Sequence, residues 1–172
     1  MARRSTWRLR RMRTPLNTEI KFSLGFEKIR DTMIKSEFNK ELAKKFKIKM
    51  DALETKNVVL SAYKSVARLI YVKHYEFPWT KYFIFKKETQ RLDSLITKNF
   101  HYPELRFLRF AIQDRAPFFL NYNNYLKEDK ELLESCFNDM SQSLKSLVSR
   151  YFLSSEWDFV ASDSVDLKCK CT

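Results

Sequence analysis

The sequence predicts an all-α protein: a single-domain bundle of about five helices with an extended basic N-terminal arm. The 172 residues contain one glycine and four prolines, too few for the many tight turns of a β fold. Hydrophobic residues make up 44% of the chain, which is enough for one sizeable core. Over most of its length, apolar residues recur every three or four positions, which is the period of a helix.

Residues 1–18 are predicted to form the arm. They contain no acidic residue and six arginines, namely Arg3, Arg4, Arg8, Arg10, Arg11 and Arg13. This Arg-rich, hydroxylated and acid-free composition is typical of a mitochondrial targeting segment. A permanent arm that places its arginines on phosphate groups has the same composition, and so does a solvated tail without a partner.

The helical domain is expected to occupy residues 19–153. At its start, apolar and polar residues alternate from Ile20 to Phe26, which predicts an extended segment that either packs over the helices or offers an edge to a partner. The helical period then takes over. It is interrupted near Asn57 and ends at Pro78, because the residue before a proline disfavours the α conformation.

The next predicted helix runs from Thr80 to about Phe100. Its apolar residues lie on one side, and its basic residues, including Lys86, Lys87 and Arg91, lie on the other. This pattern predicts a helix with one face on the core and one face in solvent.

Residues 103–115 predict a helix at the centre of the bundle. More than half of its circumference is apolar, through Leu105, Phe107, Leu108, Phe110, Ala111 and Ile112. The polar residues Arg106, Arg109 and Gln113 share one narrow stripe. Such a wide apolar arc indicates a helix enclosed by its neighbours.

A last helix is expected near residues 127–152. It carries a heptad-like repeat formed by Leu133, Phe137, Met140, Leu144, Leu147 and Tyr151. One interpretation is that these residues pack inside the bundle, and the other is that they bind a partner protein. Residues 154–172 are expected to form a tail, in which Trp157 and Phe159 would be the anchors.

The residue types give no basis for an enzyme, a cofactor or a metal site. A single glycine excludes P-loops, Rossmann turns and nucleophile elbows, which need several. The histidines His74 and His101 each stand beside a tyrosine at the end of a predicted helix. Cys169 and Cys171 lack further ligands at the spacing of a zinc site.

The net charge of +12 is unevenly distributed, with +6 in residues 1–18, +9 in residues 19–115 and −3 in residues 116–172. A basic front indicates that contact with a polyanion belongs to the first two thirds of the chain. The candidate RNA-contacting residues are the six arm arginines together with Lys44, Lys45, Lys86, Lys87 and Arg91. Exposed aromatic residues such as Trp7 or Phe83 would stack on unpaired bases. For the lysine stripes, the simpler interpretation is solubility.

In composition alone, the chain is similar to small, basic, helical proteins of large assemblies, such as mitochondrial ribosomes and respiratory complexes. We therefore expect a non-catalytic structural component of a ribonucleoprotein, in a mitochondrial ribosome, that contacts rRNA and neighbouring proteins. The alternative is a supernumerary subunit of a respiratory or ATP-synthase complex, in which the arm serves targeting or meets an anionic membrane surface. Neither function involves a small-molecule substrate.

Overall fold

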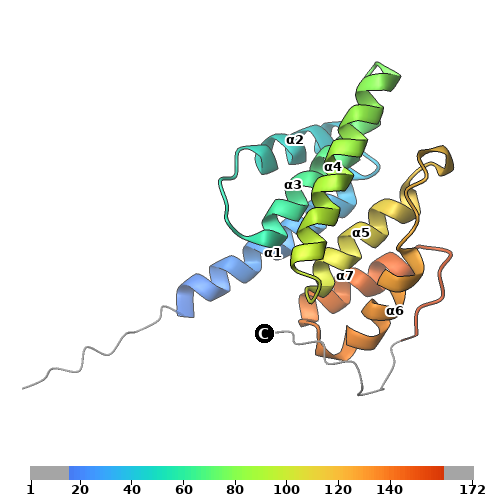
Figure 1. Ribbon diagram of the computed structural model, residues 1–172. Helices are drawn as coiled ribbons and strands as arrows, with labels where there is room; N and C mark the ends of the chain where they lie inside the picture. Colours follow the sequence, from blue (N-terminus) through green and yellow to red (C-terminus); the bar gives the residue numbers. More distant parts are fainter. Residues whose placement is uncertain (1–15, 161–172) are drawn as a thin grey trace, which may run out of the picture.

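A computed structural model describes residues 16–160, with side chains from Gly25 onward. All regular secondary structure in this part of the chain is helical (Figure 1). Its seven α-helices are α1 (Leu16–Ser36), α2 (Lys40–Asp51), α3 (Val58–Val72), α4 (Pro78–Lys98), α5 (Pro103–Arg115), α6 (Leu126–Cys136) and α7 (Gln142–Leu153). Two 3₁₀ turns, η1 (Phe118–Leu120) and η2 (Phe137–Asp139), lie between them. The all-α prediction is confirmed, and the expected number of helices was too low.

At the front of the chain, one prediction is wrong and another is confirmed. The extended segment predicted from Ile20 to Phe26 is wrong, because α1 runs through it. The break predicted near Asn57 is confirmed. The Asn57 side chain caps α3 by accepting a hydrogen bond from the Leu60 amide, at 3.0 Å, and Asn39 caps α2 in the same way.

The helix predicted to be central is α5. Leu105, Phe107, Leu108 and Phe110 are all completely buried, and α5 packs against α3, α4 and α6. Pro103 opens α5, as expected. Pro78 was expected to end the preceding helical region, but α3 already ends at Val72, and Pro78 opens α4 instead. The wide apolar arc therefore identified the core helix correctly.

The single helix expected at residues 127–152 is wrong. The chain leaves the helical conformation at Met140 (ψ 151°), and the Ser141 hydroxyl then caps a new helix by accepting from the Leu144 amide. Two helices therefore share the heptad-like repeat, which continues across the break because both pack on the same core.

The segment after α7 continues along the core. Trp157 donates from its indole nitrogen to Asp114 at 2.7 Å, and the ring of Phe159 stacks on Phe152 at 4.4 Å between centroids. These two aromatic residues hold the segment up to Val160 against the core, as expected, and the rest of the predicted tail lies outside the described residues.

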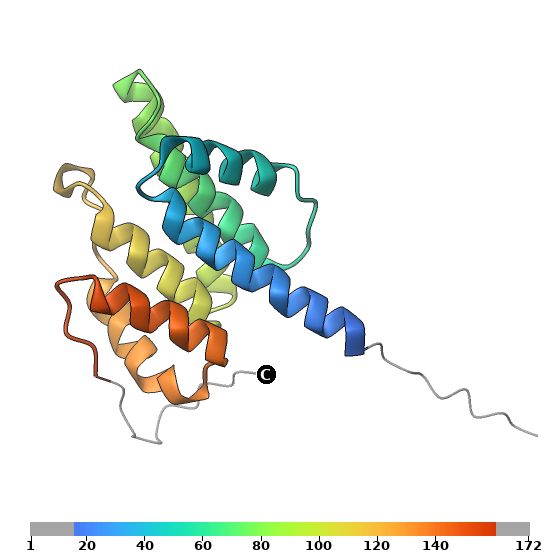
Figure 2. The same cartoon turned by 180° about the vertical axis from the view of Figure 1, so that it is seen from behind.

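Figure 2 shows how the helices are arranged. Helices α1, α3, α5 and α7 run side by side in the same general direction and end on the same side of the molecule. Helix α4 runs the opposite way, and its N-terminal end projects beyond its neighbours (Figure 1). The surfaces described below lie where α1, α3, α5 and α7 end and along the projecting helix α4.

Candidate nucleic-acid interface

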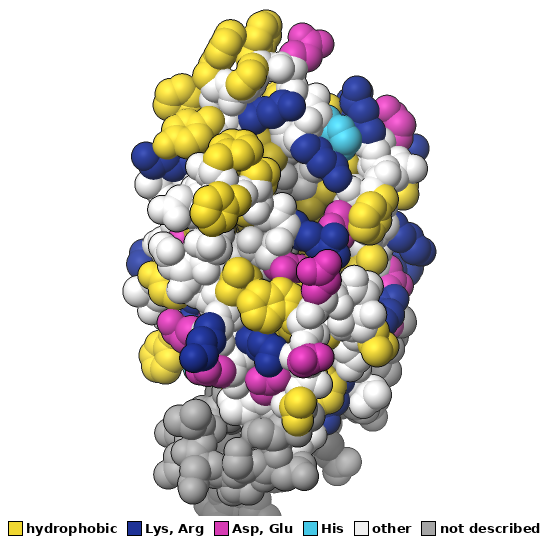
Figure 3. All heavy atoms as spheres, turned by 90° about the vertical axis from the view of Figure 1, so that its right-hand side faces the viewer, with side chains coloured by type: hydrophobic (Ala, Val, Ile, Leu, Met, Phe, Trp, Pro, Cys, Tyr) yellow, Lys and Arg dark blue, Asp and Glu magenta, His cyan; other side chains and the backbone are white. Residues whose placement is uncertain are grey.

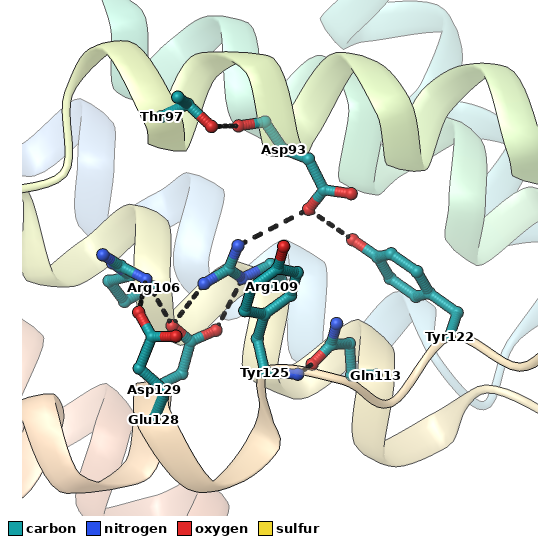
Figure 4. Close-up of polar contacts among 9 residues, drawn as sticks. All are labelled: Asp93, Thr97, Arg106, Arg109, Gln113, Tyr122, Tyr125, Glu128 and Asp129. Carbon is teal, nitrogen blue, oxygen red and sulfur yellow. Dashed lines mark hydrogen bonds and ion pairs between the residues drawn. The ribbon is translucent and has the colours of Figure 1, made fainter.

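Some of the cations of the chain are used inside the fold, and Arg109 is the clearest case (Figure 4). Its guanidinium makes two hydrogen bonds of 2.7 Å to the carboxylate of Asp129. A second carboxylate, that of Asp93, lies 3.7 Å away and accepts from the Tyr122 hydroxyl at 2.9 Å. The ring of Tyr125 covers the guanidinium at 3.9 Å. Because Arg109 is 3% exposed and Asp129 is completely buried, this arginine is part of the core.

A second buried arginine joins the front of the chain to α5. Both carboxylate oxygens of Glu104 accept from Arg30, at 2.8 and 2.7 Å. Tyr63 donates to the same carboxylate at 2.7 Å, and Arg30 also donates to Ser143 at 2.6 Å. Helices α1, α3, α5 and α7 therefore meet at one polar cluster. Glu104 lies in the first turn of α5, where the helix dipole favours an acid.

Ionisation in these clusters follows from burial and pairing. Burial lowers the pKa of Arg109, but hydrogen bonds and the charge of Asp129 outweigh it and raise the pKa above its ordinary value. The pKa of Arg30 is raised by Glu104 in the same way, against the effect of burial. Burial raises the pKa of Tyr63 well above its ordinary range, and the Glu104 charge adds to the shift. At neutral pH the arginines are therefore charged and the tyrosine is neutral.

The outward side of α4 differs from these buried clusters, because its cations are exposed. The α4 face, as we call it, comprises Phe83, Lys86, Lys87, Gln90, Arg91, Ser94 and Lys98, all of which are exposed. At 100° per residue these positions lie within an arc of roughly 140° that contains no acidic residue. The arc exists because Phe85, Leu92 and Ile96 occupy the buried side of the same helix, which packs on α3.

The cations of the α4 face are free of acidic partners. No ion pair to an acidic group in the described part of the chain involves Lys86, Lys87, Arg91 or Lys98. Lys86 lies over the ring of Tyr82, at 5.9 Å from its centroid. The positive charges therefore face solvent without internal compensation.

Aromatic side chains stand at the projecting end of the same helix. The rings of Phe77 and Trp79 stack at 5.0 Å between centroids, with 20° between their planes, and both are more than half exposed. Phe83 is 68% exposed. Figure 3 shows hydrophobic side chains gathered over this end of α4, with basic side chains beside them. Exposed rings next to free cations are the two components of a surface that binds single-stranded nucleic acid.

The structure distributes the other predicted contact residues differently. Lys44 and Lys45 are exposed on α2. Because α2 and α4 are separate helices that both pack on α3, these two lysines form a basic surface distinct from the α4 face. The arm arginines Arg3, Arg4, Arg8, Arg10, Arg11 and Arg13, together with Trp7, lie outside the described residues.

The heptad-like repeat belongs to the interior. Leu133, Met140, Leu144, Leu147 and Tyr151 are buried in the core of the chain, and Phe137 is half-buried against Phe159. The first of the two interpretations, packing inside the bundle, describes these residues. Burial accounts for the repeat without a partner, and Tyr151 also lines the groove described below; binding of a partner protein stays a prediction.

Comparison with known protein families, with characterised proteins and with solved structures finds no match to this chain. In residues 16–160, no helix is both long and apolar enough to cross a bilayer. The same part of the chain contains no group of three His, Cys, Asp or Glu residues arranged to hold a metal ion.

Sequence reasoning placed the cations of α4 on the exposed side and missed the buried pairs. Arg30 and Glu104 stand 74 positions apart, and nothing near either of them indicates the other. For Arg109 a signal existed, because a cation in the narrow polar stripe of an enclosed helix needs a buried acid, and Asp129 lies 20 positions further along.

Proposed function

We propose that this protein is a non-catalytic structural component of a large ribonucleoprotein and that it contacts RNA through the α4 face and the basic arm. The observation that carries the proposal is the acid-free, solvent-facing row of cations on α4, with exposed aromatic rings at its projecting end. Unlike Arg30 and Arg109, these cations make no ion pair with an acid in the described part of the chain.

The residue types of the α4 face suit the binding of RNA without sequence specificity. Lysine and arginine bind phosphates without reading bases, and aromatic rings stack on any unpaired base. Helix α4 has 21 residues, so it extends for about 31 Å at a rise of about 1.5 Å per residue. A rigid helix of this length offers its cations to several consecutive phosphates.

The finer architecture belongs to the same proposal. The arm, predicted over residues 1–18, would neutralise phosphates next to α1, which begins at Leu16. Residues 19–153 would form a single helical domain whose acidic C-terminal part faces neighbouring proteins, and residues 154–172 would form a tail. The assembly that we propose is a mitochondrial ribosome. This placement depends on the composition of residues 1–13 alone. Fluorescence microscopy of a fusion carrying these residues in front of a reporter tests it, and a cytosolic reporter would contradict it.

The second candidate is a supernumerary subunit of a respiratory or ATP-synthase complex. It is supported by the large apolar side chains left in solvent, among them Phe118 at 89%, Phe119 at 82% and Phe38 at 78% exposure. Apolar residues that gather on a surface are typical of proteins that are covered by a partner. In this case the arm would serve targeting or meet anionic lipid.

Gradient sedimentation of the tagged protein from its native cells, with and without RNase, separates the two candidates. We expect a heavy particle that RNase disperses, and we expect release of the protein by Lys86→Glu/Lys87→Glu/Arg91→Glu or by deletion of residues 2–13. Co-migration with a detergent-solubilised membrane complex that ignores RNase would contradict the ribonucleoprotein proposal and favour the second candidate.

A further inference from the structure

A large apolar groove lies on the side of the molecule where α1, α3, α5 and α7 end. Its lining comes from the last turns of these four helices, from the first two turns of α4 and from η1, and its volume is about 970 Å³. The groove faces away from the α4 face, because Pro78, Lys81 and Phe85 line it from the opposite side of α4. The two surfaces are therefore separate.

The floor of the groove consists of aliphatic side chains. Ile34, Ile70 and Ile112 are half-buried, and each packs against the buried core beneath the groove. Phe38 and Phe119 stand at its edges with 78% and 82% of their surface exposed. A bound molecule that covered only the floor would leave these rings in water, so the geometry favours an occupant broad enough to reach both edges.

The rim is predominantly basic. Lys73, Lys81, Arg115 and Arg150 line the groove, and Glu37 is the one acid among the lining residues. Three of these cations have a structural explanation. Arg115 pairs with Glu37 at 3.3 Å and Arg150 with Asp31 at 2.9 Å, and Lys73, Arg115 and Arg150 stand at the C-terminal ends of α3, α5 and α7. There the helix dipoles favour positive charge.

Lys81 has no such explanation. It lies at the N-terminal end of α4, where the helix dipole disfavours a cation, and it makes no ion pair with any described acid. Lys40, Lys73 and Lys81 all lie close enough to His74 to affect the pKa of its side chain. The pKa of His74 is lowered by burial and by the charges of Lys73, Lys40 and Lys81. This end of the groove therefore concentrates positive charge, and no acid among the described residues forms an ion pair with Lys81.

We propose that the groove binds an amphipathic helix of a partner protein, with leucine-type side chains on the floor and acidic residues along the basic rim. A helix about 10–12 Å wide places residues i, i+3, i+4 and i+7 on one apolar stripe. Its flanking carboxylates then meet Lys73 and Lys81, while its sides cover Phe38 and Phe119. This binding does not depend on RNA.

The test uses the full-length protein and labelled synthetic helical peptides of about 18 residues, or five turns. The acidic peptide has a leucine stripe flanked by glutamates, and the basic peptide has the same stripe flanked by lysines. The protein variants are Lys81→Glu and Lys73→Glu/Lys81→Glu. The matched control is Lys86→Glu/Lys87→Glu on the opposite side of α4, and circular dichroism verifies that each variant is folded.

We expect the acidic peptide to bind the unaltered protein and the control variant equally. We expect the double variant to bind it at least about tenfold more weakly and to gain affinity for the basic peptide instead. Equal binding of both peptides, no binding of the acidic peptide, or insensitivity to both groove variants would overturn the proposal. Displacement of the peptide by a long-chain fatty acid at lower concentration, or loss of the site by self-association in sedimentation equilibrium, would assign the groove to another occupant and overturn it as well.

Discussion

The contact between α5 and α6 and the outward face of α4 use the same residue types in opposite ways. Arg109 is buried, holds Asp129 through two hydrogen bonds and is covered by an aromatic ring. Lys87 and Arg91 are exposed and have no acidic partner in the described part of the fold. The first arrangement fixes the position of one helix against another, whereas the second does nothing for the fold that we can identify.

The difference shows how cations can be sorted in a chain with a net charge of +12. A buried cation without its acid costs several kcal/mol, so pairing inside the fold explains Arg30 and Arg109. An exposed cation contributes little to stability either way. Cations that remain unexplained by the fold are therefore the candidates for function. The following changes test this division, from the largest expected effect to the smallest.

The largest effect is expected from Asp129→Ala. This substitution leaves the Arg109 guanidinium buried without its partner, and we expect the free energy of unfolding in urea to fall by about 3–5 kcal/mol. The matched control is Glu128→Ala, because Glu128 pairs with Arg106 at 2.8 Å with 57% of its side chain exposed. We expect the control to cost less than about 1 kcal/mol. Equal losses for the two variants would contradict the division.

The cluster around Glu104 predicts a loss of stability at high pH. The pKa of Tyr63 is raised by burial and by Glu104, so the folded state keeps a proton that the unfolded state releases near pH 10. Stability is then fully present below pH 10 and falls as the pH rises beyond it, by at most about 1.4 kcal/mol per pH unit for each such tyrosine.

Urea unfolding of the protein between pH 8 and pH 11 measures this slope. Burial together with a hydrogen-bonded carboxylate also raises the pKa of Tyr122 and of Tyr151, so some slope should persist in Tyr63→Phe. We expect that variant to have a shallower slope than the unaltered protein. An unchanged slope would mean that Tyr63 ionises as readily in the fold as outside it.

A smaller effect is expected where α6 and α7 separate. Ser141→Ala removes the hydroxyl that caps α7, and we expect a loss of about 1 kcal/mol. The control is Ser146→Ala, the same change at an exposed position within α7, which should be neutral or slightly stabilising. Thermal unfolding of both variants compares the two positions. Identical melting temperatures would contradict the role of Ser141 as a cap.

The smallest effect on stability is expected on the α4 face. Lys87→Glu and Arg91→Glu should each change the free energy of unfolding by less than about 0.5 kcal/mol, because neither side chain makes an ion pair in the described part of the fold. Lys86→Glu also loses the contact with the Tyr82 ring, so its change should stay below about 1 kcal/mol. Urea unfolding of the three single variants gives the values. A loss above 1 kcal/mol in any of them would show that the side chain has a structural role.

Much of the fold could be predicted from local patterns. The apolar arc of residues 103–115 identified the core helix, Pro103 identified a helix start, and Asn57 identified a break. These signals are local because caps and helix periodicity depend on a few neighbouring residues. The division of the last helix at Ser141 was not predicted, since the heptad-like repeat continues across the break.

The candidate site could be predicted only in part. The exposed side of α4 followed from periodicity, whereas the pairing of Arg30 with Glu104 depends on helices far apart in the chain. The groove is formed by the ends of four helices, so no single segment contains it. Positions that are polar in the sequence are therefore either buried pairs or free surface, and the three-dimensional arrangement decides which.

The central claim is that the unpaired cations of α4 bind RNA, and fluorescence anisotropy with a labelled oligouridine at several salt concentrations tests it most directly. The comparison is between Lys86→Glu/Lys87→Glu/Arg91→Glu and a control of equal charge change, Lys28→Glu/Lys56→Glu/Lys127→Glu, whose three lysines are exposed elsewhere. We predict that the α4 variant loses at least about tenfold in affinity and that its slope of log affinity against log salt is smaller by about 2, while the control keeps most of both. Equal losses in the two variants would show that net charge alone attracts RNA and would contradict the assignment of the α4 face.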